Sequence, residues 1–363
     1  MDNYKNLIFN EFKNDVWTEL KNAKEPILIY GMGNGADKII NVFEKYGIKY
    51  EDVFASDGFV RGHSYRGKTV LSYNQACKKY GKSFIVVVSF GSKLPEVIER
   101  IYSLEENHTV YCPDVPVCDG ELFNQEFFDL HIKELFEARS LFYDEKSKEI
   151  FDNIIRFKLS SRPSYLRATA TTEQEADSML DFKAYESYAD LGAYNGDTIK
   201  KYTTLCQNLK TIYAFEPDMR NFKKLSKYCE ELTGINVNLY NNAVYSSDTT
   251  LDFASSGNRN SSGASVGSYQ HKTVLVEAKA LDNVVKKVDF IKYDVEGLEC
   301  QALLGTKRLI NECMPDMFVS MYHKSEDMYE LPILLHKLNP KYKLYLRRLP
   351  YIPAWDLNLY AVK

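Results

Sequence analysis

The sequence predicts an α/β protein in which two parallel sheets are joined by a helical segment. A buried apolar run followed by a glycine turn and a helix occurs twice, at residues 26–43 and from 188 to 198. Between them, residues 122–185 show helical periodicity and contain no glycine. The last two apolar segments flank prolines, as in an antiparallel hairpin at a sheet edge. We therefore expect three parts, an N-terminal domain, a helical connector and a C-terminal domain: 1–118, 119–186 and 187–363.

The sequence of the N-terminal part predicts a helix followed by a small Rossmann-like domain. Apolar side chains at helical spacing run through residues 3–21 and predict a lid or docking helix. The first strand, from residue 26, ends in a glycine turn that opens the next helix. The turn contains Gly31, Gly33 and Gly35; further strands are expected at 53–56, followed by Asp57, and at 84–90, with a helix at 96–104.

This glycine turn permits two interpretations. Residues 57–72 are similar to nucleotide-sugar-associated Rossmann modules, which implies a nucleotide or nucleotide sugar bound near the turn and Asp57. Alternatively, Gly31, Gly33 and Gly35 only permit a tight strand-to-helix turn. A catalytic nicotinamide role is disfavoured, because the chain contains no Tyr-x-x-x-Lys pair, the usual acid and base of short-chain dehydrogenase-like enzymes.

The second glycine turn predicts a nucleoside pocket. The strand that begins at Tyr188 contains Asp190, and Gly192 and Gly196 in the following turn let the backbone approach a ligand. The next strand, at 211–215, ends in Glu216, an acid placed to accept hydrogen bonds from both hydroxyls of a ribose. Two neighbouring strand ends therefore agree on one site.

The remaining C-terminal elements alternate between helices and strands. In residues 255–268, eleven of fourteen residues are Ser, Gly or Asn, which predicts either a surface loop or a loop that orders over an acceptor. The other expected elements are a helix at 221–232, a strand at 237–240, a turn at 241–247 that meets an adenine ring, buried strands at 290–293 and 317–321, and a closing hairpin of 342–348 with 357–362.

Five motifs together resemble the FkbM-type S-adenosylmethionine-dependent methyltransferase family. They are YADLGAYNGDT (188–198), AFEPD (214–218), NNAV (241–244), LDNV (281–284) and DFIKYDVEGLE (289–299), and the likeness continues through 322–327, 330–348 and 358–362. The resemblance implies a class I methyltransferase sheet with its closing hairpin, S-adenosylmethionine as cofactor, and O-methylation of a sugar hydroxyl in a glycan or glycoconjugate precursor.

The acids at strand ends suit a cofactor that carries a sulfonium, a ribose and an amino group. Alternatively, Asp190 and Asp197 cap helices, while Glu216 and Glu296 are solvated turn residues. The predicted cofactor-binding residues are Asp190, Gly192, Tyr194, Asn195, Gly196, Thr198, Glu216, Pro217, Asn242, Ala243 and Asp294.

His323 and Asp294 are the predicted catalytic residues. Both follow buried strands whose carboxyl ends meet at one edge of the sheet. An imidazole titrates near neutrality, so we expect His323 to remove the acceptor's proton or to hold its hydroxyl. A divalent metal held by Asp294, Glu296 and His323 remains an alternative that the pattern does not favour.

The composition narrows the class of protein. The formal net charge of −4 provides no electrostatic footprint for nucleic acid, and the longest apolar run is too short to span a membrane. Seven cysteines without a CxxC pair, and charged residues near the N-terminus, favour a cytoplasmic enzyme without a signal peptide. A homo-oligomer is compatible with the sequence. The two rival functions are a nucleotide-sugar oxidoreductase or epimerase and a non-catalytic nucleotide-binding scaffold.

Overall fold

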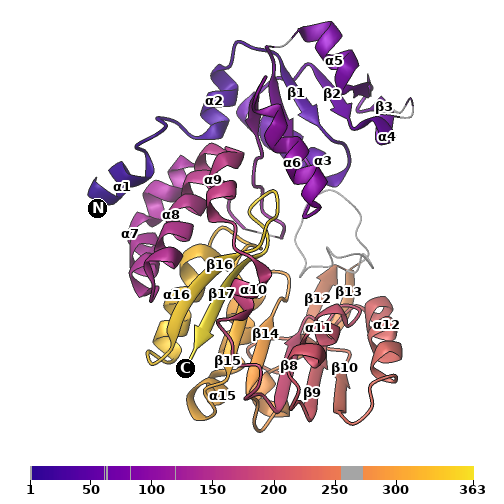
Figure 1. Cartoon of the computed structure of the whole chain (residues 1–363), viewed down its shortest axis with the longest axis vertical. Helices are drawn as coiled ribbons and strands as arrows, with labels where there is room; N and C mark the ends of the chain where they lie inside the picture. The colour runs from indigo at the N-terminus through magenta and orange to yellow at the C-terminus, as the bar shows by residue number, and fades with distance from the viewer. Residues whose placement is uncertain (1, 61, 63, 82, 119, 255–272) are drawn as a thin grey trace.

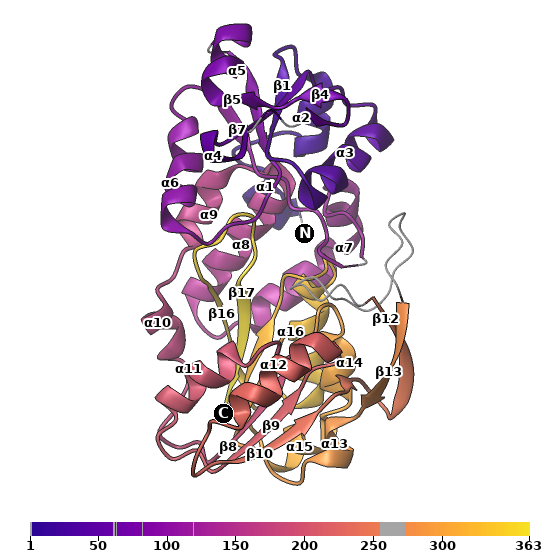
Figure 2. The same cartoon turned by 90° about the vertical axis from the view of Figure 1, so that its right-hand side faces the viewer.

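A computed structural model describes residues 2–363 apart from 61, 63, 82, 119 and 255–272. A small sheet lies at one end of the molecule, a layer of helices in the middle and a larger sheet at the other end (Figures 1 and 2). No helix in the described part of the chain is long and apolar enough to cross a membrane.

The N-terminal sheet contains five parallel strands in the order β5-β2-β1-β6-β7. Its strand order reverses between β1 and β6, which is where open α/β sheets place ligands. The strands are β1 (Ile27–Tyr30), β2 (Asp52–Ala55), β5 (Leu71–Ser72), β6 (Ile85–Val88) and β7 (Thr109–Tyr111), accompanied by α3 (Asn34–Tyr46), α4 (Asp57–Val60), the short pair β3 (Ser64–Tyr65) and β4 (Lys68–Thr69), α5 (Tyr73–Tyr80) and α6 (Pro95–Leu104).

The single helix predicted at residues 3–21 is wrong, because the chain forms two helices there. They are α1 (Asp2–Ile8) and α2 (Val16–Asn22). The Asp15 carboxylate accepts a hydrogen bond from the backbone N–H of Thr18 at 2.9 Å and so caps the start of α2. Ile8 and Phe12 before this cap and Trp17 and Leu20 after it are buried, which is why the apolar pattern continues through the break.

The middle layer consists of α7 (Gln125–Leu141), α8 (Glu145–Ser160) and α9 (Pro163–Thr169), whereas α10 (Glu173–Asp177) lies beside the large sheet (Figure 2). One hydrophobic core runs through all three layers of the molecule. It includes Val86 of the small sheet, Phe151 of α8 and Leu344 of the large sheet, all at most 1% exposed. The middle layer is therefore the shared packing surface of both sheets rather than a flexible linker.

The large sheet has seven strands in the order β10-β9-β8-β14-β15-β17-β16. The first five are parallel, and β17 and β16 are antiparallel, so the predicted closing hairpin is confirmed. The strands are β8 (Ser187–Leu191), β9 (Thr211–Phe215), β10 (Asn236–Tyr240), β14 (Phe290–Tyr293), β15 (Asp316–Ser320), β16 (Lys343–Arg348) and β17 (Leu357–Val362).

Helices flank this sheet, and a small additional sheet lies beside it (Figure 2). The helices are α11 (Asp197–Leu205), α12 (Met219–Cys229), α13 (Leu281–Val284), α14 (Glu299–Leu304), α15 (Lys307–Glu312) and α16 (Asp327–Leu338); the additional strands are β11 (Ala243–Val244), β12 (Thr249–Ala254) and β13 (Thr273–Lys279). The sequence did not predict these three strands. The Ser/Gly/Asn-rich stretch 255–268 lies outside the described residues.

Candidate active site

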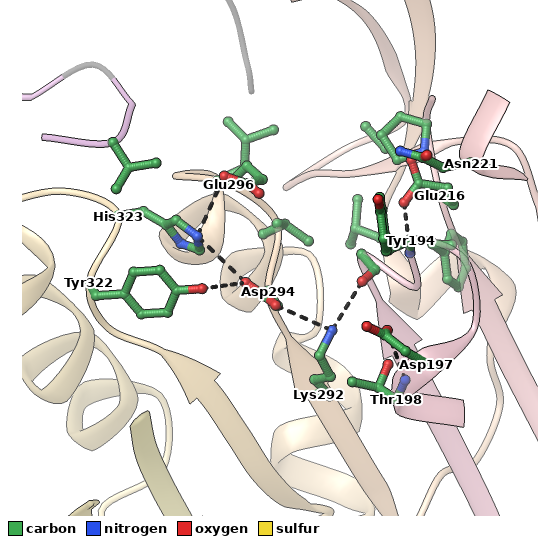
Figure 3. Close-up of a pocket in the computed structure, with 18 of the residues that line it drawn as sticks. Tyr194, Asp197, Thr198, Glu216, Asn221, Lys292, Asp294, Glu296, Tyr322 and His323 are labelled. Carbon is green, nitrogen blue, oxygen red and sulfur yellow. Dashed lines mark hydrogen bonds and ion pairs between the residues drawn. The ribbon is translucent and has the colours of Figure 1, made fainter. Parts of the chain in front are cut away.

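A cavity of about 320 Å³ opens at the carboxyl ends of β8, β9, β14 and β15 (Figure 3). The order of the large sheet reverses between β8 and β14, so the cavity occupies the position expected for a ligand in an open α/β sheet. Residues of the N-terminal part also reach its wall, namely Lys93 and Val117.

The turn after β8 requires a glycine at Gly192. Its φ angle is +85°, and a Cβ atom there would lie 1.9 Å from the backbone oxygen of Asp294. The missing side chain thus lets the β8 turn touch the end of β14 and brings the two halves of the cavity together. Gly196, with φ of +90°, precedes the first residue of α11.

Glu216 lies in the cavity wall with its carboxylate fixed by backbone donors. It accepts hydrogen bonds from the N–H groups of Tyr194 at 2.9 Å and Asp218 at 2.8 Å. The residue is 6% exposed, and burial raises the pKa of Glu216 to about 7. Each oxygen retains acceptor capacity beyond its one backbone bond, so the carboxylate can also receive two neighbouring hydroxyls of a ligand.

Asp190 lies behind the wall and does not line the cavity. It is fully buried, and it accepts hydrogen bonds from Lys292 Nζ at 3.1 Å and Thr198 Oγ1 at 2.5 Å. Lys292 Nζ also donates to the backbone oxygen of Gly192 at 3.0 Å and lies 3.6 Å from Asp294. The prediction that Asp190 binds the cofactor directly is therefore not supported; its carboxylate orients the lysine that connects β8, the glycine turn and β14.

The other residues predicted to bind the cofactor or to act in catalysis also divide into those that line the cavity and those that do not. Asn195 and Gly196 are in the turn but do not line the cavity. Those that do line it are Gly192, Tyr194, Thr198, Glu216, Pro217, Asn242, Ala243, Asp294 and His323.

His323 is surrounded by carboxylates (Figure 3). Its Nδ1 lies 2.9 Å from Glu299, and its Nε2 lies 3.5 Å from Asp294 and 3.6 Å from Glu296. Burial alone would lower the pKa of His323, but Glu299, Glu296 and Asp294 raise it to about 10. The ring is thus an imidazolium at neutral pH. A protonated ring has no lone pair to accept a proton, so the surrounding carboxylates disfavour the predicted role of His323 as the general base. The alternative role, in which His323 holds the acceptor hydroxyl, stays a prediction.

Glu296 is the acid of this cluster that is suited to accept a proton. Its side chain is 25% exposed and lines the cavity. Burial, followed by the charges of Asp294 and Glu299, raises the pKa of Glu296 to about 7 despite the opposing effect of His323. The residue has a left-handed backbone with φ of +54°, a strained conformation that is found preferentially at functional sites. Cys118 Sγ donates to its backbone oxygen at 3.1 Å.

The comparisons with known proteins identify the domain around this cavity. Residues 190–348 match the family model described as the Methyltransferase FkbM domain. This part of the chain is an FkbM methyltransferase domain. S-adenosylmethionine is the cofactor expected for methyltransferases of this family, and the match favours methyl transfer over the two rival functions.

The fold of the whole chain, including the part before the FkbM methyltransferase domain, is similar to a solved structure. The crystal structure of methyltransferase FkbM from Methylobacillus flagellatus KT superposes with a TM-score of 0.72 at 16% identity, covering 99% of this chain and 98% of that one. At this identity the likeness shows the fold alone. A putative rRNA methylase from Clostridium thermocellum (TM-score 0.35, 13% identity, 53% of this chain and 97% of that one) is too dissimilar to carry an argument. No curated protein matches the sequence.

Some residues that line the cavity or support it were missed by sequence reasoning. Lys292 had a recognisable signal, since it is a charged residue inside an otherwise apolar strand and must therefore be paired when buried. Lys93, Val117, Tyr351 and Trp355 had none, because they reach the cavity only through contacts between distant parts of the chain.

Asp294, Glu299 and His323 also have to be considered as possible ligands of a metal ion. One ligand atom each of Asp294, Glu299 and His323 lies within 4.8 Å of the others, a spacing that can hold an ion. Without a metal, the carboxylates of Asp294, Glu296 and Glu299 surround the His323 ring and raise its pKa, and a metal would require the ring to lose its proton. The two arrangements, an ion cluster centred on His323 and a metal centre, are therefore mutually exclusive.

Proposed function

We propose that this protein is an S-adenosylmethionine-dependent O-methyltransferase that methylates a sugar hydroxyl in a glycan or glycoconjugate precursor. The observation that carries the proposal is one cavity lined by two separate carboxylates, Glu216 and Glu296 (Figure 3). We assign ribose binding to Glu216 and proton removal to Glu296. When bound, S-adenosylmethionine supplies a methyl group on a positively charged sulfur.

The cofactor end of the cavity fits this ligand. Glu216 is held rigidly by two backbone donors and offers its outer lone pairs to the ribose hydroxyls. Asn242 and Ala243 line the wall next to the end of β10, where an adenine ring is expected. Lys292 and His323 are the cations of the described residues that lie closest to the proposed cofactor site. Each is paired with a carboxylate, so their positive charges are balanced and do not oppose a bound sulfonium.

Replacing Glu216 by alanine is expected to weaken S-adenosylmethionine binding by about 1.5 to 3 kcal/mol, the scale of lost hydrogen bonds to a charged group. Isothermal titration calorimetry on the folded variant is the measurement. Glu231→Ala, at an exposed position after α12, is the matched control and should bind as wild type does. Unchanged affinity in Glu216→Ala would show that this carboxylate does not bind the ribose.

Glu296 provides the base for the acceptor end. Bound S-adenosylmethionine would supply the methyl group to the acceptor oxygen and leave as S-adenosylhomocysteine, and the Glu296 carboxylate would accept the hydroxyl proton. The His323 ring and the left-handed backbone of Glu296 itself hold this carboxylate in place. Beside it, the Tyr322 O–H donates a hydrogen bond to Asp294 at 3.5 Å. The residues of the site thus align the two reactants and remove one proton.

Removing divalent metal ions with a chelator is expected to leave the rate of methyl transfer unchanged. The positive charge between the carboxylates comes from the His323 ring rather than from a metal ion. The test compares initial rates with and without excess EDTA after the protein has been dialysed against it. A loss of activity that is restored by a divalent cation would contradict this expectation and would make Asp294, Glu299 and His323 metal ligands.

The overall proposal is tested by incubating the protein with isotopically labelled S-adenosylmethionine and a panel of sugar and glycan precursors. Transfer of label to a sugar hydroxyl, identified by mass spectrometry of the product, is the expected result. Label found on nitrogen or carbon, or on acceptors without a sugar, would overturn the assignment of a sugar hydroxyl.

A further inference from the structure

Two loops from opposite ends of the sequence meet over the cavity. The loop after β6 and the loop between β16 and β17 exchange two backbone hydrogen bonds, Ser92 N–H to Ile352 O at 2.8 Å and Ile352 N–H to Ser92 O at 3.0 Å. In both views the β16–β17 loop extends from the large sheet towards the N-terminal part (Figures 1 and 2). We name this contact the loop clasp. It places one residue of the small sheet's loop in the wall of the catalytic cavity.

The aromatic residues of the loop clasp pack directly on glycine. A Cβ atom at Gly91 would lie 2.7 Å from the Trp355 ring and 3.1 Å from the Tyr351 ring. The two rings lie 5.2 Å apart between centroids, tilted by 42°, and both line the cavity. Aromatic walls with a few polar groups are typical of small-molecule sites, and ring faces offer apolar surface to the C–H groups of a sugar.

Lys93 is the residue that the loop clasp brings to the cavity. It follows Ser92 directly, its side chain is exposed, and it lines the same cavity as Glu296. The other two cationic residues of the cavity, Lys292 and His323, are buried and ion-paired. The charge of Lys93 interacts with that of Glu173, an acid that does not line the cavity, but among the described residues no carboxylate forms a salt bridge with Lys93 at 4.0 Å or less. Its ammonium is thus available for a ligand.

We propose that the acceptor is an anionic sugar whose charged group binds Lys93, while the rings of Tyr351 and Trp355 hold the sugar in the cavity. A lysine ammonium is a point charge that binds phosphate and carboxylate oxygens. Without such a cation, an anionic acceptor would be repelled by Asp294, Glu296 and Glu216, which line the same cavity. This inference rests on the proposed function, since it names the class of sugar.

The test measures binding of three sugars to the full chain saturated with S-adenosylhomocysteine: a hexose 1-phosphate, a hexuronate and a neutral methyl hexoside. Wild type, Lys93→Met and the control Lys49→Met are compared by calorimetry; Lys49 is an exposed lysine of the same domain, just before the amino end of β2. We expect wild type and Lys49→Met to bind at least one anionic sugar about 10-fold more tightly than the neutral sugar, and Lys93→Met to lose this preference.

Equal binding of charged and neutral sugars by wild type, or a preference that survives in Lys93→Met, would overturn the inference. Inorganic phosphate that binds as tightly as hexose 1-phosphate would overturn the role of the aromatic rings. Methyl transfer is measured separately. Binding that depends on Lys93 without transfer to any sugar supports the anion subsite and counts against the proposed function, whereas transfer to neutral sugars that is unaffected by Lys93→Met supports the function and overturns the subsite.

Discussion

Replacing Glu296 by glutamine is expected to lower the rate of methyl transfer about 100-fold or more, the scale for removing a general base. Glutamine has nearly the same shape but cannot accept the hydroxyl proton. Cofactor affinity should stay unchanged, because Glu216 and the backbone donors around it are untouched. The measurement is single-turnover transfer at saturating S-adenosylmethionine.

The pH dependence provides an independent check on this assignment. Only the carboxylate form of Glu296 accepts a proton, so the wild-type rate should rise with pH through about 7 and level off above it. Glu296→Gln should lose this rise, whereas Glu312→Gln, on the exposed surface of α15, should keep both rate and profile. If Glu296→Gln reacts as wild type and His323→Gln loses the activity instead, the base is His323.

Replacing Lys292 by methionine is expected to cost about 3 to 5 kcal/mol of stability, because it leaves a buried charge without its partner. Lys292 and Asp190 are 4% and 0% exposed in their side chains, so water cannot substitute for the lost ammonium. The Gly192 turn would also lose the hydrogen bond to its backbone oxygen. Urea-induced unfolding measures the change in the free energy of unfolding.

A second variant separates charge from packing at this position. The double variant Asp190→Asn/Lys292→Met removes the stranded charge and is expected to recover a large part of the loss. Lys287→Met is the surface control, since this lysine is 77% exposed and should change stability by less than about 0.5 kcal/mol. If Lys292→Met is as stable as Lys287→Met, the buried pair does not hold the turn.

Much of the large sheet was predictable because each parallel strand is a short apolar run that ends in a polar residue. The predicted strands at 211–215 and 290–293 coincide with β9 and β14. Glu216 could be placed for the same reason, as the carboxyl end of a buried strand fixes the position of the next residue. The break between α1 and α2 was missed because the Asp15 cap lies inside a continuous helical pattern.

The role of His323 could not be derived from sequence, since its protonation depends on which acids surround it. The chain separates His323 from Glu299 by more than one helix, yet their side chains are 2.9 Å apart. The turn at Glu296 contributes a further charge that periodicity does not reveal. The position of Lys93 in the cavity could not be predicted from sequence either, because it depends on the loop clasp between two segments that are far apart in the chain.

Because of the loop clasp, the residues proposed to bind the cofactor and the residue proposed to bind the acceptor come from different parts of the chain. Glu216 and the glycine turn lie in the FkbM domain, whereas Lys93 lies in the loop after β6, in the part of the chain that precedes it. If Lys93 binds the acceptor as proposed, substitutions in that loop would change which acceptor binds, while the residues around Glu216 stay the same. Under this proposal, the acceptor side of the cavity can change through the N-terminal part of the chain without any change in the FkbM domain.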